Sequence, residues 1–204
     1  MAVPPKQAAA ERARIMEAAY RCLADSDGAT ASITDILSTA GLSTRAFYRH
    51  FDSKDGLLLA MFRRDADRLL AELREATSAA ATPAEALRVM AHVMLRLTAD
   101  PRRRRRVLVL TSAEARRARG YAAEHQRFVA AQEAAIAEIL RAGRADGSFP
   151  WADPEGDARF IQAALGQAFM EQMTQTARLG PAEAADQVVG FALRALGAPA
   201  GRRD

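Results

Sequence analysis

Residues 32–54 read SITDILSTAGLSTRAFYRHFDSK, and this stretch decides the fold. Ser32 and Ser43 each stand before a short run of helical periodicity, where a hydroxyl can cap the first free amides of a helix. Gly41 lies between the two runs. Because glycine ends helices and permits tight turns, we expect the chain to turn there. The apolar positions of the stretch fall on one inner face: Ile33, Ile36, Ala40, Leu42, Phe47 and Phe51. The pattern predicts two short helices joined by a tight turn.

The rest of the chain continues this helical pattern. Residues 7–24 predict a first helix, residues 53–77 a long fourth one, and Pro or Tyr begins each of the later ones. Those later helices are expected at residues 83–97, 101–118, 121–145, 154–178 and 181–196. We therefore expect an all-α fold of about nine helices: an N-terminal three-helix helix-turn-helix domain, residues 1–52, and a C-terminal helical domain, residues 53–204.

Composition narrows the function classes. The chain has 204 residues, 50% of them hydrophobic and 26% charged, with a formal net charge of +4. Cys22 is the only cysteine, so no intramolecular disulfide can form; it is expected as a buried thiol, with a redox role as the alternative. We find no signal peptide and no apolar run of membrane-spanning length, and we expect a cytoplasmic protein.

His92 and His125 have no further ligands at metal spacing, and no nucleophile–His–acid set stands out, so we expect neither cofactor, metal nor enzyme.

The second short helix, residues 44–50, carries side chains suited to reading DNA. Arg45 can donate two hydrogen bonds to guanine, and Thr44 or Ala46 can contact a thymine methyl group. Tyr48, His50 and Lys54 are better placed for phosphates. The outward face is expected to hold Thr44, Arg45, Ala46, Tyr48, Arg49 and His50. Adding the helix starts and Lys54, the predicted DNA-binding residues are Ser32, Thr34, Ser43, Thr44, Arg45, Ala46, Tyr48, Arg49, His50 and Lys54.

From Ile15 to Leu58 the sequence resembles the TetR family of regulators. The specific part is Tyr48-x-x-Phe51-x-x-Lys54 with Ala40-Gly41 upstream. The resemblance implies nine or ten helices, a variable C-terminal ligand domain and dimerisation through the last two long helices. Leu37 and Arg45 depart from the usual Ala and Gly, and beyond about residue 80 the resemblance is architectural only.

The last two helices, residues 153–178 and 181–196, are apolar nearly all round. Each needs cover on two sides, and a second copy of the chain would supply the outer one. We interpret them as a homodimer interface, with a thick monomeric core as the alternative.

Arginine is densest outside the predicted reading helix. Residues 101–127 hold nine Arg and two Glu, a net charge of +7, while residues 1–64 have a net charge of only +2. We expect Arg102–Arg106 to form a solvated helix face paired with acids such as Asp65 and Asp67. A supplementary phosphate or relay role and an anionic-ligand site stay open as alternatives.

A ligand cavity is expected inside the middle helices. Methionine and aromatic residues concentrate there, with glutamines as polar points, which favours an apolar or amphipathic small molecule. The predicted ligand-binding residues are Met94, Phe128, Trp151, Phe169 and Met173.

Together these patterns predict a dimeric DNA-binding regulator on a palindromic operator. We expect a repressor that a small molecule releases from double-stranded DNA. The alternatives are a ligand-independent DNA-binding factor, an activator, and an enzyme or pure ligand carrier on the same scaffold.

Overall fold

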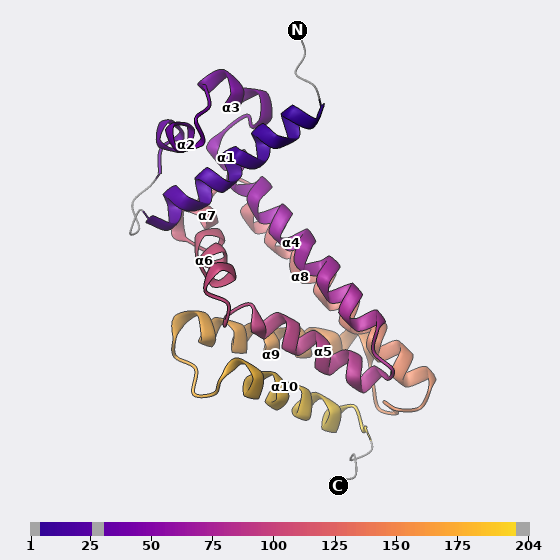
Figure 1. Ribbon diagram of the computed structural model, residues 1–204. Coiled ribbons are helices and arrows are strands. Elements are labelled where there is room, and N and C mark those ends of the chain that lie inside the picture. Colours follow the sequence, from indigo (N-terminus) through magenta and orange to yellow (C-terminus); the bar gives the residue numbers. More distant parts are fainter. Residues whose placement is uncertain (1–4, 26–30, 199–204) are drawn as a thin grey trace. The chain divides into compact units, whose positions relative to one another are not determined.

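The computed structural model describes residues 5–25 and 31–198, and every regular element in them is an α-helix. These described residues form ten helices, which are labelled in Figure 1. In chain order they are α1 (Pro5–Asp25), α2 (Ile33–Ala40), α3 (Thr44–His50), α4 (Lys54–Ser78), α5 (Pro83–Arg96), α6 (Pro101–Leu110), α7 (Ala113–Arg117), α8 (Tyr121–Ala145), α9 (Pro154–Thr174) and α10 (Pro181–Ala195). The predicted all-α fold is confirmed.

One predicted helix is two in the structure. The segment expected as a single helix over 101–118 ends α6 at Leu110 and begins α7 at Ala113. The reason is local: Ser112 adopts an extended conformation, and its hydroxyl accepts a hydrogen bond from the Ala115 N–H at 3.2 Å. Serine competes in this way with the helical ladder and starts a new helix.

Contacts divide the chain into two compact units. Unit 1 holds residues 1–65 and 105–124, and unit 2 holds residues 66–104 and 125–204. Helices α4, α6 and α8 each contribute residues to both units. This grouping describes packing alone, so the functional boundary at residues 52/53 stays a prediction.

In unit 1, α1 packs against α2 and α3 (Figure 1). Ile15 and Met16 of α1, Ile36 of α2 and Phe47 of α3 are at most 1% exposed, so one core joins the three helices. This packing stabilises helices that are too short to persist alone in water.

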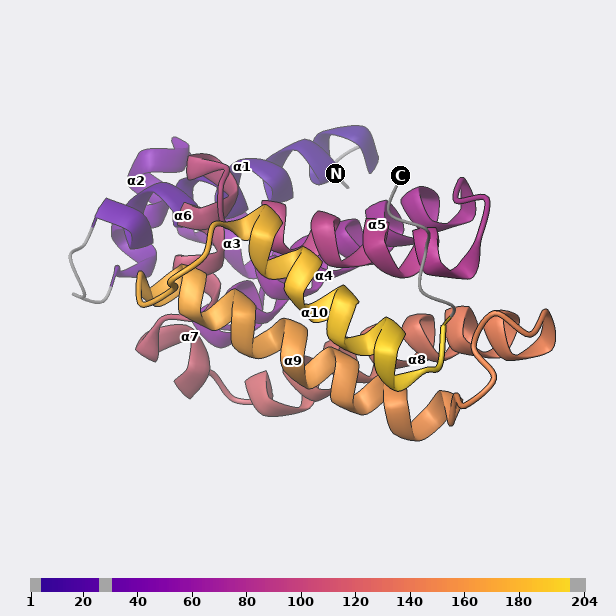
Figure 2. The same cartoon turned by 90° about the horizontal axis from the view of Figure 1, so that it is seen from below.

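In unit 2, α5 packs against both α9 and α10, and the last two helices run side by side (Figures 1 and 2). Leu87, Met90, Leu165 and Ala185 are nearly or fully buried there. Gly143 of α8 allows the closest approach, because a Cβ there would lie 2.1 Å from the Phe149 ring.

The outer sides of α9 and α10 remain uncovered in this single chain. Phe160 is 74% exposed and Phe191 59% exposed, and Met170 and Leu179 are exposed as well. Large exposed apolar side chains on neighbouring helices are typical of an interaction surface.

In residues 5–25 and 31–198, none of the helices is long and apolar enough to cross a membrane.

Candidate nucleic-acid interface

The first short helix, α2, begins in a reciprocal cap. The Ser32 hydroxyl accepts from the Asp35 N–H at 3.1 Å, and the Asp35 carboxylate accepts from the Ser32 N–H at 3.1 Å. Hydrogen bonds from the Ser32 hydroxyl and N–H lower the pKa of Asp35, so the carboxylate is ionised at neutral pH. Ser32 and Thr34 are both exposed at this start. The capping box fixes where α2 begins and leaves these hydroxyls accessible.

The turn between α2 and α3 depends on Gly41. Its φ of 60° and ψ of 43° lie in the left-handed region, and the Leu42 N–H returns to the Leu37 carbonyl at 3.1 Å. Arg14 of α1 donates to the Ala40 carbonyl at 2.6 Å. This arrangement is a Schellman-type helix end, which sets the direction in which α3 departs.

The candidate reading helix, α3, begins at Ser43, whose hydroxyl accepts from the Ala46 N–H at 3.3 Å. Ser43, Thr44, Arg45 and Tyr48 are exposed, and Tyr48 is 57% exposed. The Tyr48 ring packs edge-on against the buried Phe47 ring, with centroids 5.4 Å apart. The buried Phe47 ring thus supports the exposed polar face of α3 from below.

The expectation that Ala46 points outward is wrong, because Ala46 is only 4% exposed. The helical repeat explains the difference. Ala46 stands one position before Phe47, and four residues before His50, whose side chain is 8% exposed. Positions i and i+4 share one face of a helix, and here that face turns inward.

Arg49 and His50 both meet Glu11 of α1. The Glu11 Oε2 atom lies 2.7 Å from Arg49 Nη1 and 3.1 Å from His50 Nε2. The hydrogen bond with His50 is the main cause that lowers the pKa of Glu11, and the Arg49 charge adds to it against partial desolvation. The carboxylate is therefore ionised at neutral pH and draws both side chains toward α1.

Lys54, predicted to contact phosphate, forms an ion pair with Glu114 of α7. The start of α4 is capped by Ser53, whose hydroxyl accepts from the Gly56 N–H at 3.0 Å. Neither Glu11 nor Glu114 could be found from the sequence, since each lies about 40 to 60 residues from its partner along the chain.

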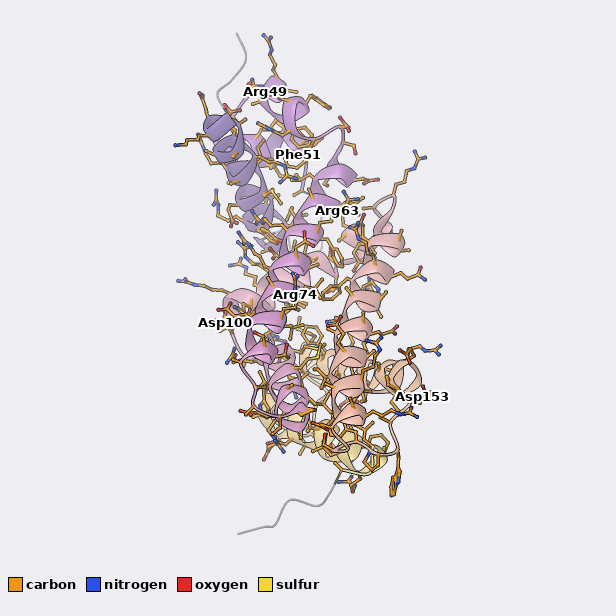
Figure 3. The ribbon with its side chains drawn as sticks, turned by 90° about the vertical axis from the view of Figure 1, so that its right-hand side faces the viewer. Arg49, Phe51, Arg63, Arg74, Asp100 and Asp153 are labelled. Atoms are coloured by element: carbon orange, nitrogen blue, oxygen red, sulfur yellow. The ribbon has the colours of Figure 1, made fainter. Side chains whose placement is uncertain are left out.

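The arginine run is paired as the solvated-face interpretation expects: Asp65 is one of the partners, and Glu17 and Glu72 are partners that were not expected. Arg106 forms ion pairs with Glu17 and Asp65, and Arg103 pairs with Glu72 at 2.9 Å. The Asp100 carboxylate accepts from the N–H groups of Arg102 and Arg103, at 2.9 and 2.8 Å. This carboxylate at the start of α6 (Asp100 is labelled in Figure 3) and the paired acids offset the repulsion between the helix dipole and five arginines.

The predicted ligand-binding residues lie in unit 2 but do not share one environment. Met94 and Met173 are buried, Phe128 and Phe169 are partly buried, and Trp151 is 73% exposed. The expectation that Trp151 lies in the interior is wrong. The backbone N–H of Trp151 donates to the Leu196 carbonyl at 3.2 Å, which anchors the backbone near the end of α10 while the ring stays exposed.

Glutamines do reach the interior of unit 2. Gln132 is 2% exposed; its amide nitrogen lies 3.9 Å from the Met94 sulfur, and its oxygen accepts from Gln162 at 3.4 Å. A thioether is a weak acceptor, so this amide nitrogen is poorly satisfied for a buried group.

Comparison with known proteins identifies the N-terminal stretch. Residues 15–61 match the family model described as bacterial regulatory proteins, tetR family. A curated HTH-type transcriptional regulator of Mycobacterium tuberculosis is 34% identical over 87 residues, which is 43% of this chain and 43% of the relative. The matched stretch therefore spans less than half of the relative's length.

Two solved structures share the fold over nearly the whole chain. The FadR regulator of Bacillus subtilis in complex with stearoyl-CoA has a TM-score of 0.74 at 16% identity, covering 90% of this chain and 98% of its own. The SmeT–triclosan complex has a TM-score of 0.76 at 22% identity, covering 91% of each chain. With the capped α2–turn–α3 unit and the match over residues 15–61, the N-terminal part of this chain is similar to the tetR family of bacterial regulatory proteins.

Proposed function

We propose that this chain is a sequence-specific DNA-binding transcriptional regulator whose α3 enters the major groove. The exposed face of α3 carries the argument: Thr44, Arg45 and Tyr48 project from a helix that Ser43 caps and Phe47 anchors. Arg45 can bind guanine with two hydrogen bonds, and Tyr48 can contact backbone phosphate.

A gel-shift assay with operator DNA tests the reading face. We expect Arg45→Ala to weaken operator binding by about 5- to 150-fold, the equivalent of about 1–3 kcal/mol for one base contact, and to relax the preference at one base pair. Arg21→Ala is the matched control, since Arg21 is an exposed arginine of α1 in the same unit. Equal affinity of Arg45→Ala, Tyr48→Ala and wild type would refute this reading face.

The regulator is proposed to act as a homodimer through α9 and α10. The exposed Phe160 and Phe191 rings are the support, because a second copy would cover them. Two copies of α3 about 34–36 Å apart would then read a palindrome in successive major grooves.

An apolar or amphipathic small molecule is the proposed effector, bound within unit 2. The support is the poorly satisfied Gln132 amide beside Met94, together with two fold relatives solved with stearoyl-CoA and triclosan. A coupling of about 1–3 kcal/mol between ligand and DNA would release the operator. Those two compounds are the first probes: operator affinity should fall when one of them binds, and Gln132→Leu should weaken that binding.

The sign of regulation is proposed to be repression. A reporter under the operator should rise when the gene is deleted; a fall would identify an activator. DNA binding that no ligand alters, with no ligand bound in unit 2, would favour a ligand-independent factor.

A further inference from the structure

Two glutamates bind basic side chains that DNA phosphates would otherwise attract. Glu11 of α1 binds Arg49 and His50 through one oxygen, and its side chain is only 12% exposed. Glu114 of α7 binds Lys54, with side-chain exposures of 19% and 24%. Partial burial makes these pairs stronger than fully exposed ones, because water and salt screen them less.

The geometry around Lys54 keeps Glu114 in place. The Arg119 N–H, two residues beyond α7, donates to the Asp55 carboxylate at 3.0 Å. Asp55 follows Lys54 in the first turn of α4. Two contacts therefore join α7 and the residues after it to this turn: the Glu114–Lys54 ion pair and the Arg119–Asp55 hydrogen bond. The ion pair is therefore part of the packing of unit 1 and not a chance meeting of two long side chains.

Arg45 differs from the paired cations. It is exposed on α3, and the described part of the chain records no hydrogen bond or ion pair for it. The cation suited to reading a base is thus free, while those suited to phosphates are held by carboxylates.

Phosphate contacts supply most of the affinity for DNA of any sequence, and each contributes about 0.9 to the slope of log affinity against log salt. A phosphate contact that first has to displace a carboxylate of the protein contributes less affinity. Such a carboxylate therefore lowers the sequence-independent affinity for DNA. It leaves the hydrogen bonds to bases untouched.

We propose that Glu11 and Glu114 are specificity-determining residues: they hold Arg49, His50 and Lys54 away from phosphates and so suppress binding to arbitrary DNA. This inference rests on the proposed function. Specificity is a difference of affinities, and suppressing the wrong complex raises it as effectively as improving the right one.

The test is the salt dependence of binding to two duplexes, one of random sequence and one holding the selected operator. Glu11→Gln and Glu114→Gln keep the side-chain shape and an acceptor oxygen while removing the charge. Each is expected to steepen the random-duplex slope by about 0.9, so that the gain over wild type is about threefold larger at 50 mM than at 200 mM salt. Operator affinity should rise less, so the ratio of specific to random affinity falls.

Three controls make the result decisive. Glu138→Gln, an exposed glutamate of α8, removes the same charge and should leave the slope unchanged. The double variant Glu11→Gln/Arg49→Gln should return to the wild-type slope, because the released cation is gone. Thermal melts of each variant establish that unit 1 is folded.

An unchanged slope in both glutamate variants overturns the inference, as does an equal change in Glu138→Gln. Weaker binding to both duplexes at an unchanged slope also overturns it, because the glutamates would then only position α3. A wild-type protein that prefers no sequence overturns the proposed function, and this inference with it.

Discussion

One guanidinium nitrogen of Arg106, in α6, lies 2.7 Å from each carboxylate oxygen of Glu17, in α1. The same guanidinium lies over the Tyr20 ring, 4.3 Å from its centroid, and the Tyr20 hydroxyl donates to Asp65 at 2.9 Å. Arg106 is thus the central member of a network within unit 1 that joins α6 to α1.

Removing Arg106 should destabilise unit 1. We expect Arg106→Gln to lower the free energy of unfolding by about 1 kcal/mol, less than is usual for charged hydrogen bonds, because both partners are about a third exposed or more. Urea denaturation measures the change. Arg102→Gln, from the exposed part of the same run, should cost much less, and equal losses would refute the network's role.

Tyr20 should make stability fall at alkaline pH. Burial is the main cause that raises the pKa of its hydroxyl well above the usual value of 10, and the neighbouring Asp65 charge adds to it. In the unfolded chain the phenol ionises near pH 10, whereas in the folded chain it stays protonated, so stability is complete below pH 10 and is lost as pH rises above it. Denaturation curves from pH 8 to 11 should show a smaller alkaline loss for Tyr20→Phe than for wild type. Tyr48→Phe, at an exposed ring, should behave as wild type; identical alkaline losses in all three proteins would contradict this assignment.

Gly41 should resist replacement by any residue with a Cβ that avoids positive φ. At φ 60°, alanine costs about 1–2 kcal/mol, and its Cβ would meet Arg14 Nη2 at 3.4 Å. We expect Gly41→Ala to lower both stability and operator affinity, and Gly41→Asn to lose less, because asparagine tolerates this region. Thermal unfolding and gel shift check both, and a fully stable Gly41→Ala would contradict the turn geometry.

Charge on the exposed face of α9 and α10 should block self-association. Phe160→Glu and Phe191→Glu each place a carboxylate where a second copy would bury it unpaired, so sedimentation should show a monomer. Ala71→Glu, at an exposed site of α4, adds the same charge and should stay dimeric. A monomeric wild type would refute the proposed dimer.

The sequence predicted best what local chemistry decides. Ser32, Gly41 and Ser43 act through neighbours within a few residues, so helix ends and the turn could be located from residue type and spacing alone. The same local chemistry explains one wrong prediction, the single helix over 101–118. The segment is divided at Thr111-Ser112, because Ser112 caps a new helix there.

Long-range partners were not predictable. Glu11 meets His50 and Glu114 meets Lys54 only because folding brings α1 to α3 and α7 to α4 within unit 1. Orientation failed for a related reason: Ala46 and Trp151 have apolar or small side chains that suit either side of a helix or turn. The packing of neighbouring elements decides which side they take.

Selection of binding sites from genomic DNA tests the central claim most directly. The measurement compares sequences enriched by wild type with those enriched by Arg45→Ala, at a stated salt concentration. We predict that wild type enriches a palindrome with half-sites about one helical turn apart, and that Arg45→Ala loses preference at one symmetric pair of positions. Enrichment of no sequence by the wild type, or of the same palindrome with equal preference by Arg45→Ala, would contradict the account.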